Sequence, residues 1–261
     1  MRLAIYQSEP VAADAGQGLA RLAEGVARAA DAGADLVVAP EMALTGYMIG
    51  AEACARLAEP RGGQYHQAVA AMARKHRIAV AFGYPEQTPM GVRNAAALFD
   101  AGGTHLLDYA KTHLWSDIDR SQFIAGDTVS SIVEFRGWQV AFGICYDIEF
   151  PEYARKLTLS GANLILVPTA SAMPYLSAPQ RIVPTRAEEN AIVVAYANYA
   201  GEEGGTPYAG HSCVVGPDGE DRARAGFDPA LIVADLDRSA IAHRAGEIPY
   251  LADRRPDLYS I

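Results

Sequence analysis

The chain has 261 residues, half of them apolar, and a formal net charge of −9 at neutral pH. This length and apolar content suffice for one large α/β domain or for two small ones. The acidic balance argues against a nucleic-acid partner, because binding nucleic acid needs a basic face. No apolar run reaches the roughly 20 residues that span a bilayer, so no membrane segment is expected.

The cysteines and the N-terminal segment bear on the cellular compartment. Three cysteines without regular spacing cannot form a disulfide framework, and unpaired thiols suit a reducing cytosol. The segment Met1–Tyr6 lacks a basic region followed by a long apolar stretch, so no secretion signal is expected. These features predict a cytoplasmic protein.

Short β-rich runs alternate with Ala-rich stretches whose apolar residues recur at three- and four-residue spacing. Strands are predicted at Leu3–Tyr6, Leu36–Ala39, Ile78–Gly83, Asn94–Phe99, His105–Tyr109, Trp138–Ile144, Leu164–Val167, Ile192–Ala197, His211–Val215 and Leu231–Asp235. Helices are predicted at Gly18–Ala32, Ala51–Ala58, Tyr65–His76, Pro151–Ser160 and Thr185–Asn190. Hairpins between helices favour an α/β fold with two helix-covered sheets over a single doubly wound sheet.

No linker-like or low-complexity stretch divides the chain, so residues 1–261 are expected to form a single domain. The tail from about His243 onward contains Pro249 and Pro256 and is expected to be irregular. Packing on another subunit is the role predicted for this tail.

Side chains of types that act in catalysis follow three predicted strands. In open α/β folds, active sites lie at strand ends. Glu41 and Lys111 each come after an apolar strand, and Cys145 ends another and opens onto a polar turn. Taken singly, each is more often a structural or solvated group. Together they are chemically complete for acyl transfer, with Glu41 moving the proton, Lys111 holding the oxyanion and Cys145 carrying the acyl group. Spacing alone does not show that the three residues meet.

No metal or cofactor is predicted. The histidines show no His-x-His or His-x3-His pairing, and the cysteines show no Cys-x2-Cys. No glycine-rich phosphate loop is present either. The expected reaction therefore uses side chains and water alone.

Three segments resemble, in order, the signature motifs of the nitrilase, or carbon–nitrogen hydrolase, superfamily. These segments are Pro40–Tyr47, Tyr109–Trp115 and Gly143–Glu152, and further similarity lies at Leu3–Gln7, Arg186–Asn190, Gly210–Ser212 and Gly216–Gly219. The resemblance therefore covers nearly the whole chain. It implies a four-layer αββα sandwich, a homodimer or larger homo-oligomer, and a Glu–Lys–Cys triad at Glu41, Lys111 and Cys145.

Two positions depart from the family pattern. Members often carry a second acid, commonly Glu, eight residues after the lysine, and here that position holds the shorter Asp119. Asp117 competes for this role, because alternation along an extended segment places both acids on the same side. Glu149 stands where many members carry Arg, and Arg155 in the next predicted helix is a possible partner for it.

The resemblance also implies a reaction and a pocket. The expected reaction hydrolyses a small carboxamide to a carboxylic acid and ammonia through a thioester on Cys145. The backbone N–H of Tyr146 joins Lys111 in stabilising the oxyanion. By carry-over from the family, Trp115 and the turn that contains Thr169 and Ala170 line the pocket.

Within the family, the motifs look closest to bacterial amidases of the 5-aminopentanamidase and R-stereoselective amidase type, whose small amide substrates often bear an amine. An acidic pocket of Glu41, Asp119 and Asp147 would suit such a cationic amine, unless Asp147 instead orients backbone in its turn. The alternative is an N-carbamoyl-amine or ω-amide hydrolase with the same triad. A non-catalytic binding protein on this scaffold is more remote, because the triad is intact.

Overall fold

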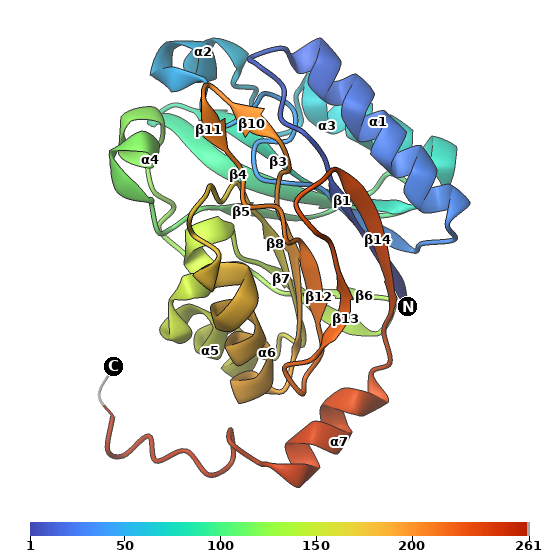
Figure 1. The fold of residues 1–261 in the computed structure, drawn as a ribbon, viewed down its shortest axis with the longest axis vertical. Coiled ribbons are helices and arrows are strands. Elements are labelled where there is room, and N and C mark those ends of the chain that lie inside the picture. Colours follow the sequence, from blue (N-terminus) through green and yellow to red (C-terminus); the bar gives the residue numbers. More distant parts are fainter. Residues whose placement is uncertain (260–261) are drawn as a thin grey trace.

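The computed structural model describes residues 1–259, which form two mixed β-sheets with helices on their outer faces (Figure 1). The first sheet contains, in spatial order, β14 (Ala230–Asp235), β1 (Arg2–Gln7), β2 (Leu36–Val38), β3 (Ala79–Thr88), β4 (Gly91–Phe99) and β5 (His105–Ala110). The second contains β13 (Asp221–Arg224), β12 (Cys213–Val215), β9 (Val193–Ala197), β8 (Leu164–Pro168), β7 (Trp138–Phe142) and β6 (Val133–Phe135).

Helices and short elements complete the described chain. The α-helices are α1 (Ala15–Asp31), α2 (Gly50–Leu57), α3 (Gln64–His76), α4 (Ser116–Gln122), α5 (Pro151–Leu159), α6 (Val183–Asn190) and α7 (Ser239–Glu247). The short elements are the 3-10 helix η1 (Cys145–Glu149), the π-helix η2 (Ala178–Ile182) and the two-stranded ribbon β10 (Glu202–Glu203) and β11 (Thr206–Pro207). In the described part of the chain, no helix has the length and apolar content that crossing a membrane requires.

Alternation of side chains along the strands gives the sheets two apolar faces. In β1, Leu3 and Ile5 point into the core between the sheets, whereas Ala4 and Tyr6 pack with α1 and α3 on the outer face. Helices α5 and α6 cover the outer face of the second sheet (Figure 1). The four-layer αββα sandwich that the resemblance implies is confirmed.

Strand β3 is longer than the sequence predicts. Instead of ending at Gly83, it continues through Tyr84 and Pro85, where Pro85 pairs with Asn94 of β4. Strand β2 pairs with β3 only as far as Ala81. Beyond that point loop backbone lies along the same side of β3, where the Gly83 and Gln87 N–H groups donate to the Pro40 and Glu59 carbonyls and the Glu59 N–H donates to the Pro85 carbonyl. Proline is tolerated here because Pro85 directs its carbonyl, and with it its nitrogen, to the loop side, so its pairing with Asn94 loses no hydrogen bond.

The segment Ser116–Gln122 forms α4, where the sequence predicts an extended segment. Helical geometry turns Asp117 and Asp119 onto different faces. Asp119 is fully buried, whereas the Asp117 side chain is fully exposed. The expectation that both acids share a side is therefore wrong, and Asp119 is the acid that faces the interior.

The C-terminal tail is not irregular from its start. Residues 243–247 belong to α7, which extends the chain beyond the body of the sandwich (Figure 1). Arg244 ties α7 to α6 through an ion pair with Glu188 at 2.8 Å, although α7 has no buried residue. The irregular part of the tail therefore begins after Glu247.

Candidate active site

The structure brings the predicted carboxylate, ammonium group and thiol into one site between the sheets. Glu41 and Lys111 follow β2 and β5 of the first sheet, and Cys145 follows β7 of the second. Lys111 Nζ donates to Glu41 Oε1 at 2.8 Å. The charges of both residues act on the pKa of the Cys145 thiol.

Glycine at position 83 lets the backbone of Glu41 lie close against β3. The Gly83 N–H donates to the Pro40 carbonyl at 3.2 Å, and a Cβ on Gly83 would lie 2.5 Å from the Met42 nitrogen and 2.7 Å from Glu41 Cα. Only glycine permits so close a backbone approach. On the other side, the Glu41 N–H donates to the Thr169 carbonyl at 3.4 Å, so this segment bridges the two sheets.

The two carboxylate oxygens of Glu41 have different environments. Oε1 accepts hydrogen bonds from Asn94 Nδ2 at 2.6 Å and from Lys111 Nζ at 2.8 Å, whereas Oε2 has no hydrogen-bond partner among the described residues. Burial raises the pKa of Glu41; Lys111 opposes this shift and Asp119 adds to it. A carboxylate with a raised pKa and a free oxygen is suited to accept and return a proton.

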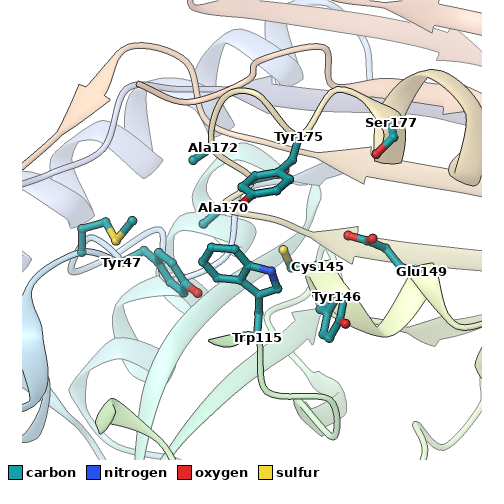
Figure 2. Close-up of a pocket in the computed structure, with 11 residues that line it drawn as sticks. Tyr47, Trp115, Cys145, Tyr146, Glu149, Ala170, Ala172, Tyr175 and Ser177 are labelled. Atoms are coloured by element: carbon teal, nitrogen blue, oxygen red, sulfur yellow. The ribbon is translucent and has the colours of Figure 1, made fainter. Parts of the chain in front are cut away.

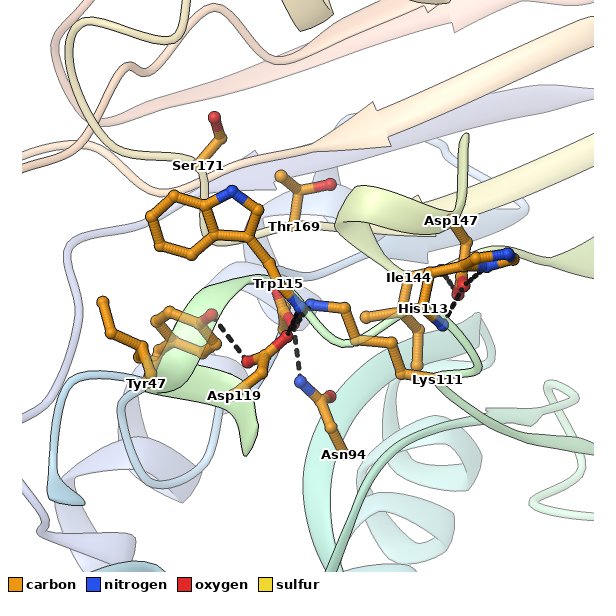
Figure 3. A network of polar contacts seen from close by, with 12 residues as sticks. Tyr47, Asn94, Lys111, His113, Trp115, Asp119, Ile144, Asp147, Thr169 and Ser171 are labelled. Carbon is orange, nitrogen blue, oxygen red and sulfur yellow. Dashed lines mark hydrogen bonds and ion pairs between the residues drawn. The ribbon is translucent and has the colours of Figure 1, made fainter. Parts of the chain in front are cut away.

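Lys111 is a fully buried cation held by two carboxylates. Its Nζ lies 2.7 Å from Asp119 Oδ2 (Figure 3). The same Nζ donates to Glu41. Burial lowers the pKa of Lys111, but the charges of Glu41, Cys145 and Asp119 outweigh it and raise the pKa well above its usual value. An ammonium group has three hydrogens, so one remains for a third acceptor.

Asp119 reaches Lys111 despite its shorter side chain. Its Oδ1 accepts from the Tyr47 hydroxyl at 2.7 Å, and its Oδ2 accepts from the Trp115 N–H at 2.8 Å (Figure 3). Both oxygens are therefore occupied, and helix α4 carries the carboxylate back toward the end of β5. Asp119 thus contacts Lys111 and is not one of the residues that line the cavity described below.

Cys145 occupies a strained turn at the start of η1. Its φ of +48° lies in the left-handed region that residues other than glycine rarely adopt, and such positions cluster at functional sites. Asp147 holds the turn, because Oδ2 accepts from the Ile144 N–H at 2.9 Å and Oδ1 from the His113 N–H at 3.0 Å. Its Oδ2 also accepts from the Tyr109 hydroxyl at 2.8 Å. Asp147 therefore orients backbone, one of the two roles that the sequence left open.

The thiol of Cys145 needs a base before it can attack. Burial and the charge of Glu41 raise the pKa of Cys145 well above its usual value, against the opposing effects of Lys111 and the Ala170 N–H. The thiol is therefore protonated at neutral pH, whereas the nucleophile is the thiolate. The free Oε2 of Glu41 is the acceptor that the site offers for this proton.

A cavity of about 170 Å³ lies over Cys145 (Figure 2). An engineered cavity of ~150 Å³ holds a benzene molecule, so this one accepts a small ligand. It is lined by Tyr47, Met48, Trp115, Cys145, Tyr146, Glu149, Ala170, Ser171, Ala172, Tyr175 and Ser177.

Of the predicted pocket residues, Trp115, Tyr146 and Ala170 line the cavity, and Thr169 does not. The Thr169 side chain is buried, and its hydroxyl donates to the Val167 carbonyl at 3.0 Å. It contributes to the site through its backbone carbonyl alone.

The predicted acidic pocket of Glu41, Asp119 and Asp147 is wrong. The first two carboxylates bind Lys111, the third holds the turn at Cys145, and none of the three lines the cavity. The charged side chain that lines it is Glu149.

Glu149 does not form the predicted ion pair with Arg155. Its backbone carbonyl instead accepts from Arg186 Nη2 at 2.8 Å, and its carboxylate lies at the cavity wall (Figure 2). Burial raises the pKa of Glu149, against the opposing charges of Lys111 and Arg186.

Sequence reasoning missed the contributions of Tyr47, Asn94 and Glu149. Tyr47 lies within a recognised motif, but only the fold shows that its hydroxyl reaches Asp119. Asn94 is a single polar residue at the start of an apolar run, a signal that was available in the sequence. Glu149 was visible as a departure from the family pattern, but its direction into the cavity depends on the turn of η1.

Outside the cavity, the described residues His66, His105 and Asp108 place potential metal ligands within 4.8 Å of one another. However, Arg61 Nε lies 3.0 Å from Asp108 Oδ2, so a cation already occupies this carboxylate. His66 Nδ1 accepts from the Gly62 N–H at 3.2 Å, so in a neutral ring Nε2 carries the hydrogen and cannot ligate a metal. The geometry fits an ion-pair cluster better than a metal centre.

Comparison with known sequences agrees with this geometry. The carbon–nitrogen hydrolase family profile matches residues 2–245. The chain is 47% identical over 260 residues to a Pseudomonas protegens protein described as a hydrolase in the pqqF 5′ region, covering 99% of this chain and 90% of that one. It is 33% identical over 256 residues to an (R)-stereoselective amidase of a Pseudomonas species, covering 98% and 92%.

Solved structures give the same result. The E41Q/C145A double mutant of the amidase from Nesterenkonia sp. AN1, in complex with acrylamide, matches with a TM-score of 0.89 and 33% identity. The match covers 99% of this chain and 95% of that one. The chain therefore belongs to the carbon–nitrogen hydrolase family, within the nitrilase superfamily, and is a hydrolase that acts on amides.

Proposed function

We propose that the chain is a cysteine amidase that converts a small carboxamide to a carboxylic acid and ammonia through a thioester on Cys145. The observation that carries the proposal is the buried Glu41–Lys111 pair beside a protonated thiol at a small cavity. The mutated amidase with acrylamide supports it, since that protein was altered at a glutamate and a cysteine with the same numbers as Glu41 and Cys145.

The first step forms the carbon–sulfur bond and gives a tetrahedral adduct. Glu41 Oε2 accepts the thiol proton while the Cys145 sulfur attacks the amide carbon and the carbonyl electron pair moves to oxygen. The remaining Lys111 hydrogen and the Tyr146 N–H stabilise this oxyanion, and losing one such donor typically costs about 3–4 kcal/mol of barrier. Tyr146 is the second residue of η1, where backbone N–H groups have no partner within the helix.

The second step releases ammonia and regenerates the thiol. The oxyanion pair returns to re-form the carbonyl as the carbon–nitrogen bond breaks, and Glu41 gives its proton to the departing nitrogen, which leaves a thioester on the Cys145 sulfur. Glu41 then takes a proton from water, which attacks the thioester carbon, and returns that proton to the departing sulfur. The Glu41 carboxylate is therefore ionised at the end of each cycle, as it was at the start.

A substrate panel with an ammonia readout tests the proposal and separates it from its alternatives. The panel contains short carboxamides, ω-amides that end in a carboxylate, and N-carbamoyl amines. We expect the wild type to release ammonia from the carboxamides, and Cys145→Ala to keep its circular-dichroism spectrum and lose turnover. Cys213→Ala, the same change at a buried strand position outside the cavity, serves as control and should remain active.

Undiminished ammonia release by Cys145→Ala would contradict the mechanism. Turnover of N-carbamoyl amines or carboxylate-bearing ω-amides alone would favour the alternative hydrolases. If the wild type neither released ammonia from any compound of the panel nor carried an acyl group, a binding protein would be favoured.

A further inference from the structure

We propose that Glu149 recognises a positively charged amine, so that the site prefers carboxamides bearing an ammonium group. This inference rests on the proposed amidase function and names its substrate class. The sequence suggested Glu41, Asp119 and Asp147 for such a role. Glu41 and Asp119 instead form ion pairs with Lys111, and Asp147 holds the turn at Cys145.

Glu149 supplies the negative charge of the cavity. Among the described lining residues it is the one whose side chain is ordinarily charged at neutral pH. Figure 2 shows the Glu149 carboxylate, the Cys145 sulfur and the Trp115 ring directed into the same space. A ligand whose amide carbon sits on the sulfur therefore extends past this carboxylate.

The Glu149 carboxylate lacks a partner within the described chain. Arg186 is the neighbouring cation, but its Nη1 contacts Glu189 at 3.2 Å, its Nε binds the Ile148 carbonyl at 3.2 Å and its Nη2 binds the Glu149 carbonyl. No described lysine or arginine lies within ion-pair distance of the Glu149 carboxylate. A partly buried charge without a partner is costly, and a ligand cation relieves that cost.

The cavity walls also suit a cation. Trp115 and Tyr175 meet edge to face with ring centroids 5.6 Å apart, and Tyr146 lies beside Glu149 in the lining. Aromatic faces attract ammonium groups through their ring quadrupoles. The cation that would oppose this, Lys111, is fully buried between two carboxylates.

The geometry of η1 sets the scale of the substrate. Cys145 and Glu149 are its first and last residues, so at ~2.0 Å rise per residue they stand about 8 Å apart along the axis. A short aliphatic spacer between the amide and the ammonium group spans a separation of this order. Very short and long ω-amino amides should therefore both be poorer substrates.

The test compares a length series of ω-amino amides, from 3-aminopropanamide to 6-aminohexanamide, with neutral isosteres that carry a methyl group in place of the ammonium. For wild type we expect a lower KM for the charged member of the best pair. Glu149→Gln should raise that KM by about tenfold or more and should change the KM for the neutral isostere by a much smaller factor. Glu149→Arg should instead favour an amide that ends in a carboxylate, such as 5-carbamoylpentanoate.

Glu152→Gln makes the same substitution at an exposed position outside the cavity lining and serves as the matched control. Equal effects of Glu149→Gln on the charged and neutral amides, or a wild type that does not distinguish them, would overturn the inference. Turnover of the neutral isostere by the variant reports that it has folded. Failure of the amidase function itself is distinguishable, because the wild type would then release ammonia from neither member of the pair.

Discussion

Single side chains in this site act mainly through their neighbours. Glu41, Lys111 and Cys145 could be predicted from the sequence because motifs carry them at strand ends. The net direction of their pKa shifts could not, because burial opposes the attraction of Lys111, and only the structure shows that burial prevails for Glu41 and Cys145. The role proposed for Glu149 likewise depends on the geometry of η1, which the residues of the motif that contains it do not reveal.

Asp119→Asn is predicted to move the acid limb of the kcat/KM profile to lower pH. Glu41 must be ionised to accept a proton, and its pKa is raised above 4.5 in part by the charge of Asp119. With a neutral amide at position 119 the pKa of Glu41 falls, so the ionised fraction persists to lower pH. The midpoint of the wild-type acid limb is expected above pH 4.5. Initial rates across acidic pH measure the profiles of the wild type and the variant.

Asp117→Asn provides the control, because Asp117 lies on the same helix with its side chain fully exposed. This variant should keep the wild-type midpoint. A midpoint that stays in place or rises in Asp119→Asn would show that Asp119 does not act on Glu41 in this way.

Helices and strands could be predicted where the periodicity of apolar residues was strong. Where it was weak, their type and ends depend on backbone contacts that the sequence does not show. Strand β1 alternates cleanly between the two cores, and the sequence places it correctly. Helix α4 was missed because acids at positions 117 and 119 mimic the alternation of a strand and no side chain caps its start. The extension of β3 was missed because proline ends most strands, and the backbone arrangement that tolerates Pro85 is a tertiary feature.

Gly83→Ala is predicted to impair both stability and catalysis. The added Cβ would collide with the backbone of Met42 and Glu41, which must shift away from β3. Such overpacking typically costs about 1–3 kcal/mol of unfolding free energy, and the shift displaces the proposed base. Thermal melts and kcat on a good amide measure the two effects.

The matched substitution Gly226→Ala introduces a Cβ into open space in the loop between β13 and β14. It should leave kcat unchanged and alter stability by less than about 1 kcal/mol. Wild-type kcat in Gly83→Ala would show that β3 does not set the position of Glu41.

At the scale of the whole molecule, the alternation of strands and helices indicated two helix-covered sheets, and the family resemblance of the ordered motifs implied the four layers. The tail was harder, since it has no motif and α7 buries none of its residues in the single chain. Tyr250 and Leu258 remain 46% and 67% exposed, although large apolar side chains are usually covered. We propose that this tail packs on a second copy of the chain in a homo-oligomer.

Light scattering tests that proposal. The wild type should have the molar mass of a dimer or larger assembly, and Tyr250→Glu combined with Leu258→Glu should lower it. Met90→Glu changes a side chain that is 80% exposed in the turn between β3 and β4 and should leave the molar mass unchanged. An unchanged mass in the tail variant would place the interface elsewhere.

The central claim is that the acyl group of the substrate becomes attached to the Cys145 sulfur. The most direct measurement is mass spectrometry of protein quenched in acid within one turnover of an amide, followed by peptide mapping. The predicted result is a mass increase equal to the acyl group on the peptide that contains Cys145. Turnover with no acylated peptide, or with the acyl group on a different residue, would contradict the account.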